Sequence, residues 1–197
     1  MSIFAPDKNI NKNMTPEEYI QFKAFARIDG AYLGVAWIIS FVFYIGGLSS
    51  PLLGLLGAII AILSPFFAAY RLRKFRDYAR EGVISFRRAL AYYISMFLYA
   101  SLLLALAQYI YFAYIDGGYL FNTYSNVLSM PEAVEILKAY GISQQQMQQS
   151  INELAQSSTI NIVLNILSTN IIIGIVIGIP MAAVMMRKNA LPGHQQP

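Results

Sequence analysis

The residues that could carry out chemistry are few and scattered in this sequence of 197 residues. The chain contains no cysteine, which excludes disulfides, thiolate catalysis and cysteine-based metal sites. Its one histidine, His194, lies in a polar C-terminal segment, and a single imidazole cannot build a metal site. The serines therefore have no histidine base as a partner, and the acidic residues are scattered in loops. The sequence predicts neither an enzyme nor a bound cofactor or metal.

Polar side chains recur at helical spacing in the last apolar stretch of the chain. Asn161, Asn165 and either Ser168 or Thr169 share one face of the helix predicted there. In lipid such groups need hydrogen-bond partners, which usually lie on a neighbouring helix. Gln108, in the outer half of the preceding apolar stretch, is placed at a similar depth. We expect these residues to make interhelical contacts. A permeation or ligand site is the alternative, although such a pathway normally includes an ionisable residue.

A basic segment, residues 71–88, contains seven Lys and Arg residues and two acidic residues. Near a membrane, such a cluster attracts anionic lipid headgroups by about 1 kcal/mol per charge. The candidate headgroup contacts are Arg71, Arg73, Lys74, Arg76, Arg87 and Arg88. The alternative is that the cluster only determines which side of the membrane this segment occupies.

Small residues spaced by four allow helix backbones to approach closely in lipid. Gly174 and Gly178 form such a pair in the last apolar stretch, and comparable pairs occur in the other apolar stretches. We expect these residues to mediate helix packing inside one bundle. A dimer interface through Gly174 and Gly178 is the alternative.

The elements that position these residues are long apolar stretches. Four of them contain no Asp, Glu, Lys or Arg: residues 30–48, 51–70, 89–115 and 160–186. Only 12% of the chain is charged, whereas a soluble domain has about 25%. A helix needs roughly 20 apolar residues to cross the hydrocarbon core of a bilayer. The two-residue connection Ser49–Ser50 forces the first two stretches into an antiparallel hairpin. We therefore expect an all-α fold, an integral membrane four-helix bundle.

The distribution of Lys and Arg predicts the orientation of this bundle. These residues gather in segments 1–29 and 71–88 and directly after the last apolar stretch. The long loop 116–159 contains only Lys138. Because cytoplasmic loops carry an excess of Lys and Arg, both termini are predicted to be cytoplasmic in a multi-pass protein.

The domain organisation follows from these spans. Residues 1–29 are expected to form a cytoplasmic N-terminal segment with a lead-in helix that starts at a capping box on Thr15. Residues 30–188 form the transmembrane domain, and residues 189–197 form a flexible tail. In the loop 116–159, a helix over Pro131–Tyr140 and a second one capped by Ser143 predict a helical extracytoplasmic hairpin between the third and fourth spans.

Three segments carry a resemblance to a known family. They are YRLRKFRD at residues 70–77, EGVISF at residues 81–86, and YFAYID at residues 111–116, at the end of a long apolar helix. With these segments the chain resembles domain-of-unknown-function family 4199, over about residues 20 to 188. The resemblance implies a small bacterial protein with four transmembrane helices, located in the inner membrane. It implies no catalytic residues.

The function expected from the sequence is that of a non-enzymatic accessory or scaffold protein of the bacterial inner membrane. It would act through helix–helix or outer-loop contacts, with membrane lipids and a homodimer or another membrane protein as partners, and without nucleic acid. The alternative is a small oligomeric transporter or channel, and an enzyme acting on lipid comes third. A continuous polar cavity from Gln108 and Asn165 to either surface would favour transport. A tightly packed bundle with an exposed apolar outer hairpin would favour the scaffold.

Overall fold

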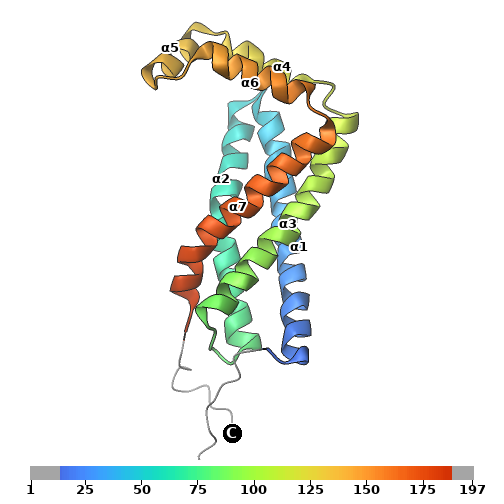
Figure 1. Ribbon diagram of the computed structural model, residues 1–197, viewed down its shortest axis with the longest axis vertical. Helices are drawn as coiled ribbons and strands as arrows, with labels where there is room; N and C mark the ends of the chain where they lie inside the picture. Colours follow the sequence, from blue (N-terminus) through green and yellow to red (C-terminus); the bar gives the residue numbers. More distant parts are fainter. Residues whose placement is uncertain (1–13, 188–197) are drawn as a thin grey trace, which may run out of the picture.

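The computed structural model describes residues 14–187, and these residues are almost entirely helical (Figure 1). The described part contains no β-strand, only an isolated bridge between Ile84 and Arg187. Predictions about residues 1–13 and the tail 189–197, with Lys188 and His194, lie outside the described residues. The elements are α1 (Pro16–Gly47), α2 (Pro51–Lys74), the π-helical turn η1 (Phe75–Ala79), α3 (Phe86–Tyr114), α4 (Tyr119–Leu128), α5 (Pro131–Ala139), α6 (Gln144–Gln156) and α7 (Thr159–Met185).

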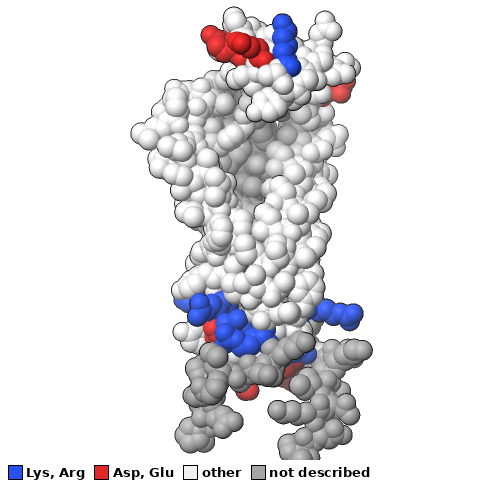
Figure 2. All heavy atoms as spheres, turned by 90° about the vertical axis from the view of Figure 1, so that its left-hand side faces the viewer, with Lys and Arg blue, Asp and Glu red and all other residues white. Residues whose placement is uncertain are grey.

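Within the described residues, four helices are long and apolar enough to cross a membrane: α1, α2 together with η1, α3 and α7. The 32 residues of α1 extend over roughly 48 Å, which exceeds a hydrocarbon core of about 30 Å. Its charged first turns therefore project beyond the apolar part. On the face shown in Figure 2, Lys, Arg, Asp and Glu side chains gather at the two ends of the molecule. This arrangement is that of a membrane protein.

Local signals start the helices where the sequence predicts. The Thr15 hydroxyl accepts a hydrogen bond from the Glu18 N–H, and the Glu18 side chain accepts one from the Thr15 N–H. From this capping box α1 runs without a break into the first apolar stretch, so the lead-in helix and the first span are one helix.

A proline inside α2 removes one of its backbone hydrogen bonds. Pro65 has no N–H to donate to the carbonyl of Ala61, four residues earlier. The Ser64 hydroxyl donates to this carbonyl instead, at 2.8 Å. The replacement satisfies the carbonyl, and α2 continues as an α-helix to Lys74.

Helix α3 is central to the packing of the long helices. It packs against both α1 and α7, and α1 packs also against α2. A Cβ atom built on Gly30 of α1 would lie 2.6 Å from the Tyr99 Cβ and 2.8 Å from the Met96 carbonyl oxygen of α3. Only glycine permits this approach of the two backbones.

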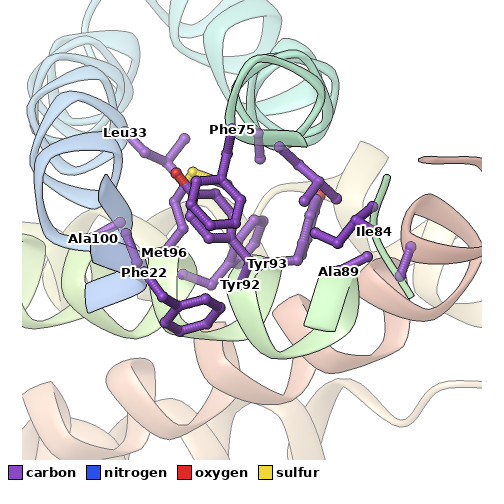
Figure 3. Close-up of a cluster of buried hydrophobic side chains, with 14 residues drawn as sticks. Phe22, Leu33, Phe75, Ile84, Ala89, Tyr92, Tyr93, Met96 and Ala100 are labelled. Atoms are coloured by element: carbon purple, nitrogen blue, oxygen red, sulfur yellow. The ribbon is translucent and has the colours of Figure 1, made fainter. Parts of the chain in front are cut away.

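A cluster of buried hydrophobic side chains, shown in Figure 3, lies toward the basic end of the molecule. There Phe75 of η1 stacks on Tyr92 of α3 with ring centroids 4.2 Å apart, and Phe22 of α1 meets both rings edge-on. All three side chains are buried. This aromatic cluster joins η1 to α1 and α3.

The loop between α3 and α7 contains one more helix than the sequence predicted. Helix α4 begins after Gly117 and Gly118, which both have positive φ angles, a conformation that glycine adopts easily. The Asp116 carboxylate, two residues before the N-cap Gly118, accepts hydrogen bonds from the N–H groups of Gly118 and Leu120, at 3.0 and 3.1 Å, and so satisfies free N–H groups at the start of the new helix. The sequence Asp-Gly-Gly is typical of a loop, and for this reason the prediction missed α4.

Helices α4, α5 and α6 form a layer across one end of the molecule (Figure 1). Helix α4 packs against α6. It also contacts the α1–α2 turn, where the Tyr119 hydroxyl lies 2.8 Å from the Ser49 hydroxyl. A second hydrogen bond joins the hydroxyls of Tyr124 and Tyr44. These contacts hold the layer on the ends of the long helices.

Candidate functional site

A crevice of about 520 Å³ lies in the half of the molecule next to α4–α6. It is lined by residues of α1, α2, α3 and α7, and Leu120 of α4 contributes at the end of the molecule. The face shown in Figure 2 is hollowed in this region, below the α4–α6 layer. The crevice therefore opens sideways, at a level where the surrounding helices are apolar.

The walls of the crevice are mainly apolar. Trp37 of α1 meets Phe97 of α3 edge-on, with ring centroids 5.1 Å apart, and both rings line the crevice. On the α2 side the lining residues are small and include Gly54, Ala58 and Ala61. Because these residues have little or no side chain, α2 leaves the space beside it unfilled.

Few polar groups face this space, and the two serines among them are satisfied within the chain. Ser40 donates to the Gly57 carbonyl at 2.8 Å, and Ser64 donates to α2 itself. Gln108 is different. It is only 5% exposed, and its Oε1 has no hydrogen-bond partner among the described residues. A buried amide without partners is unfavourable. Gln108 therefore offers unused hydrogen-bonding capacity in an apolar setting.

The structure does not bring the polar face of α7 to Gln108. Asn161, Asn165, Ser168 and Thr169 are all exposed, and no hydrogen bond joins any of them to Gln108 within the described residues. Their exposure has a simple cause. Helix α7 turns another face toward α3, and this places the four polar residues on the outside.

One other polar residue of α7 does line the crevice. Asn170, which is half-buried, is the α7 amide that lines the crevice together with Gln108. Ser168 donates to the carbonyl of Leu164 in its own helix, at 2.8 Å. Contacts of Asn161 and Asn165 with another helix therefore require a helix outside this chain.

Gly174 and Gly178 lie at the interface between α7 and α3. A Cβ atom on Gly174 would be 2.6 Å from the Phe97 ring, and one on Gly178 would be 3.0 Å from the Tyr93 ring. Both glycines are buried. A dimer through this pair would have to displace α3, so their small size serves packing within the chain.

The basic segment contains a buried ion pair. Arg71 of α2 donates its Nε to an oxygen of Asp29 in α1, at 2.7 Å, and a second guanidinium nitrogen contacts the same oxygen. The Tyr92 hydroxyl of α3 donates to the other carboxylate oxygen at 2.5 Å. Asp29 is 1% exposed. An unpaired carboxylate in this position would be very costly, and the two partners together satisfy it.

Arg76 anchors the end of α7. It is buried, pairs with the adjacent Asp77 at 2.7 Å and donates to the Met185 carbonyl at 2.9 Å. Met185 is the last residue of α7. Its carbonyl has no partner within the helix, so Arg76 satisfies a free helix end.

Two more basic residues share one carboxylate near the start of α1. Arg80 lies 2.6 Å from the Glu18 carboxylate, and Arg88 lies 3.7 Å from it. The hydrogen bond from Arg80 lowers the pKa of Glu18, which lies in the projecting part of α1. This pairing ties the segment after α2 to α1 at the basic end of the molecule.

The candidate headgroup contacts thus divide into two sets. Arg71, Arg76 and Arg88 are engaged in internal contacts, as described above. Arg73 is exposed and lies 3.6 Å from Asp77, Arg87 is exposed, and Lys74 is half-buried. Within the described residues, Arg73 and Arg87 are the most accessible of the six to lipid headgroups.

Sequence reasoning missed the Asp29–Arg71 pair, although a signal for it exists. Asp29 precedes the first apolar stretch and Arg71 follows the second, and only two residues connect these stretches. In an antiparallel hairpin of two helices of similar length, the residues at the open end lie opposite each other. On the sequence alone Arg71 is a candidate headgroup contact, and no role is predicted for Asp29.

Comparison with known proteins gave one match. A family model described as "Protein of unknown function (DUF4199)" matches residues 29–187, which include the crevice, the buried ion pair and the α4–α6 layer. Neither the comparison with curated proteins nor the comparison with solved structures gave a match.

Proposed function

We propose that this chain, which belongs to the DUF4199 family of proteins of unknown function, is a non-enzymatic accessory or scaffold protein of a bacterial inner membrane. In this proposal α1, α2, α3 and α7 cross the membrane as a four-helix bundle. Both termini are cytoplasmic, and α4–α6 form an extracytoplasmic layer. The protein acts through contacts of this layer and of its membrane helices with other proteins.

The observation that carries the proposal is the exposure of apolar side chains on α4–α6 and the adjoining turns. Tyr140 is 79% exposed and Ile136 is 58% exposed, although this layer lies beyond the apolar part of the long helices. Apolar side chains that are exposed outside the apolar part of the molecule are available for contacts with another protein. Further exposed apolar side chains of this layer are Val127, Met130, Ile142 and Leu154.

The outward face of α7 supports helix–helix contacts. Asn161 and Asn165 are exposed on a helix that otherwise presents apolar residues such as Ile172 and Val176 on this side. In hydrocarbon an amide gains from a hydrogen-bonding partner. An amide both donates and accepts, and a second copy would present its own amides at the same depth. A homodimer is therefore one way to cover this face.

The crevice gives less support to a transporter or channel. A transport path would need polar groups that continue to a surface. Gln108 and Asn170 line the crevice, but Asn165 does not, and most of the other lining residues are apolar. This lining favours the scaffold over the transport alternative.

Site-specific photo-cross-linking in cells tests the proposal. A benzophenone amino acid is placed at Ile136 in the α4–α6 layer, at Asn165 on α7, or at Ile62 of α2 as the control. Ile62 is 66% exposed on a face that the proposal assigns to lipid. We expect discrete protein adducts from Ile136 or Asn165, including a dimer of this chain from Asn165, and none from Ile62. If neither site gives more protein adduct than Ile62, the scaffold proposal is wrong.

A further inference from the structure

We propose that the crevice binds one hydrocarbon chain of a glycerolipid and that Gln108 forms a hydrogen bond with the ester group of this lipid. This inference rests on the proposed membrane crossing of the four long helices. It does not depend on the scaffold role, because the crevice and the α4–α6 surface are different parts of the molecule. The occupant is inferred from the position, size and lining of the crevice, and from the unpaired amide in it.

The position of the crevice favours a lipid chain. It opens sideways below the α4–α6 layer, where the surface on this face is uncharged (Figure 2). On α2 the lining runs from Gly54 to Pro65, and on α7 from Ile166 to Ile177. Each run extends over roughly 17 Å along its helix. In a membrane the nearest material outside the opening is the hydrocarbon of lipid chains.

The size and lining suit the same occupant. A volume of about 520 Å³ falls in the range of roughly 300–1,000 Å³ that is common for ligand sites. Aromatic rings, Trp37 and Phe97 among them, form the floor, and Ala58 and Ala61 of α2 keep one side open. An apolar cleft that the protein leaves unfilled loses dispersion contacts, and an acyl chain restores them.

Gln108 identifies the polar part of the ligand. Its amide is buried at the crevice, and Oε1 has no partner among the described residues. An amide carries two N–H donors as well as its oxygen, so Gln108 can donate through Nε2 to an acceptor in the crevice. Gln108 lies six residues before Tyr114, the last residue of α3, which is roughly 9 Å below the helix end. An ester carbonyl at this depth accepts from the amide, while its chain continues along Trp37.

A natural probe is available for the test. Trp37 is the only tryptophan of the chain and lines the crevice. The full-length protein is reconstituted in vesicles that contain a small, increasing fraction of a phosphatidylcholine brominated on its acyl chain. We expect Trp37 fluorescence to fall steeply and to saturate at a low brominated fraction. Quenching that rises only in proportion to the bulk fraction would show that no lipid site exists.

Two substitutions locate the site. Ala58→Phe places a ring in the crevice, whereas Ala113→Phe places the same ring on an exposed position of α3 that does not line it. We expect A58F to abolish the saturable quenching and A113F to retain it. Equal saturation in both variants would overturn the assignment of the lipid to this crevice. Absence of quenching in the wild type would overturn it as well and would indicate a protein segment in the crevice.

The hydrogen bond to the ester is tested separately, and this test does not require A58F to fold. Gln108→Leu and a brominated ether-linked lipid each remove one partner of the proposed hydrogen bond. A bond of ordinary strength predicts apparent affinity about two- to tenfold weaker in either case. We expect no further loss when both changes are combined. If ester and ether lipids bind the wild type equally well, Gln108 does not recognise the ester.

Discussion

At the scale of single residues, the carboxylate of Asp29 is the buried group that most needs its partners. It lies between three helices with Arg71 and Tyr92 as its partners. Removing charges from water is costly, and their mutual attraction compensates only when both partners are present. Such a pair contributes little net stability compared with apolar residues. Loss of one partner, however, leaves a buried charge.

We therefore expect Arg71→Met to lower the free energy of unfolding by about 3 kcal/mol. The double variant Asp29→Asn with Arg71→Met is expected to recover more than half of this loss, because no charge remains buried. Denaturant unfolding in detergent, followed by Trp37 fluorescence, measures both values. If the double variant is no more stable than R71M, the buried charge is not the cause of the loss.

At the scale of elements, the contact between α1 and α3 depends on glycine. At Gly30 an added Cβ meets the backbone carbonyl of Met96, which cannot move without bending α3. At Gly54, in the contact between α2 and the end of α1, the nearest atom is the Cα of Gly47 at 3.4 Å. Both glycines lie in α-helices, and they differ in the space around them.

This difference predicts opposite results for the same substitution. Gly30→Ala is expected to destabilise the protein by about 1–3 kcal/mol, because it overpacks a close helix contact. Gly54→Ala is expected to be neutral or slightly stabilising, since alanine is the better helix former. The same unfolding measurement checks both variants. If both variants lost the same amount of stability, the close approach of the backbones at Gly30 would not be the cause of the loss.

At the scale of the whole molecule, charge is separated along the long axis (Figure 2). Residues 71–88, from the end of α2 to the start of α3, contain seven basic residues, whereas the loop that forms α4–α6 contains only Lys138. Even though Arg71 and Arg76 are engaged in internal pairs, this end keeps an excess of positive charge. By the positive-inside rule, the proposed orientation has this end in the cytoplasm.

Cysteine labelling tests this orientation without a background, because the chain has no cysteine. Gln145 of α6 and Tyr78 of η1 are both exposed. In intact cells with a permeable outer envelope, a membrane-impermeant maleimide is expected to label Gln145→Cys. Tyr78→Cys should react only after the inner membrane is opened. The reverse labelling pattern would mean that the protein has the opposite orientation in the membrane.

The sequence by itself was sufficient to predict the helical class, the four apolar helices, most helix starts and the family. These features depend on local properties: the length of an uncharged stretch, a capping residue such as Thr15, a proline such as Pro51, and motifs read along the chain. Helix α4 was missed because Asp116, whose carboxylate accepts hydrogen bonds at the start of this helix, is followed by two glycines.

The tertiary structure alone decided which faces of the long helices meet. A helix that is apolar nearly all round has no single face that its sequence marks as the inner one. On α7 the polar stripe through Asn165 suggested an inner face, yet Gly174 and Gly178 pack on α3 and the stripe remains outside. The crevice beside Gln108 depends on how four helices are spaced, and no segment of the sequence carries that information.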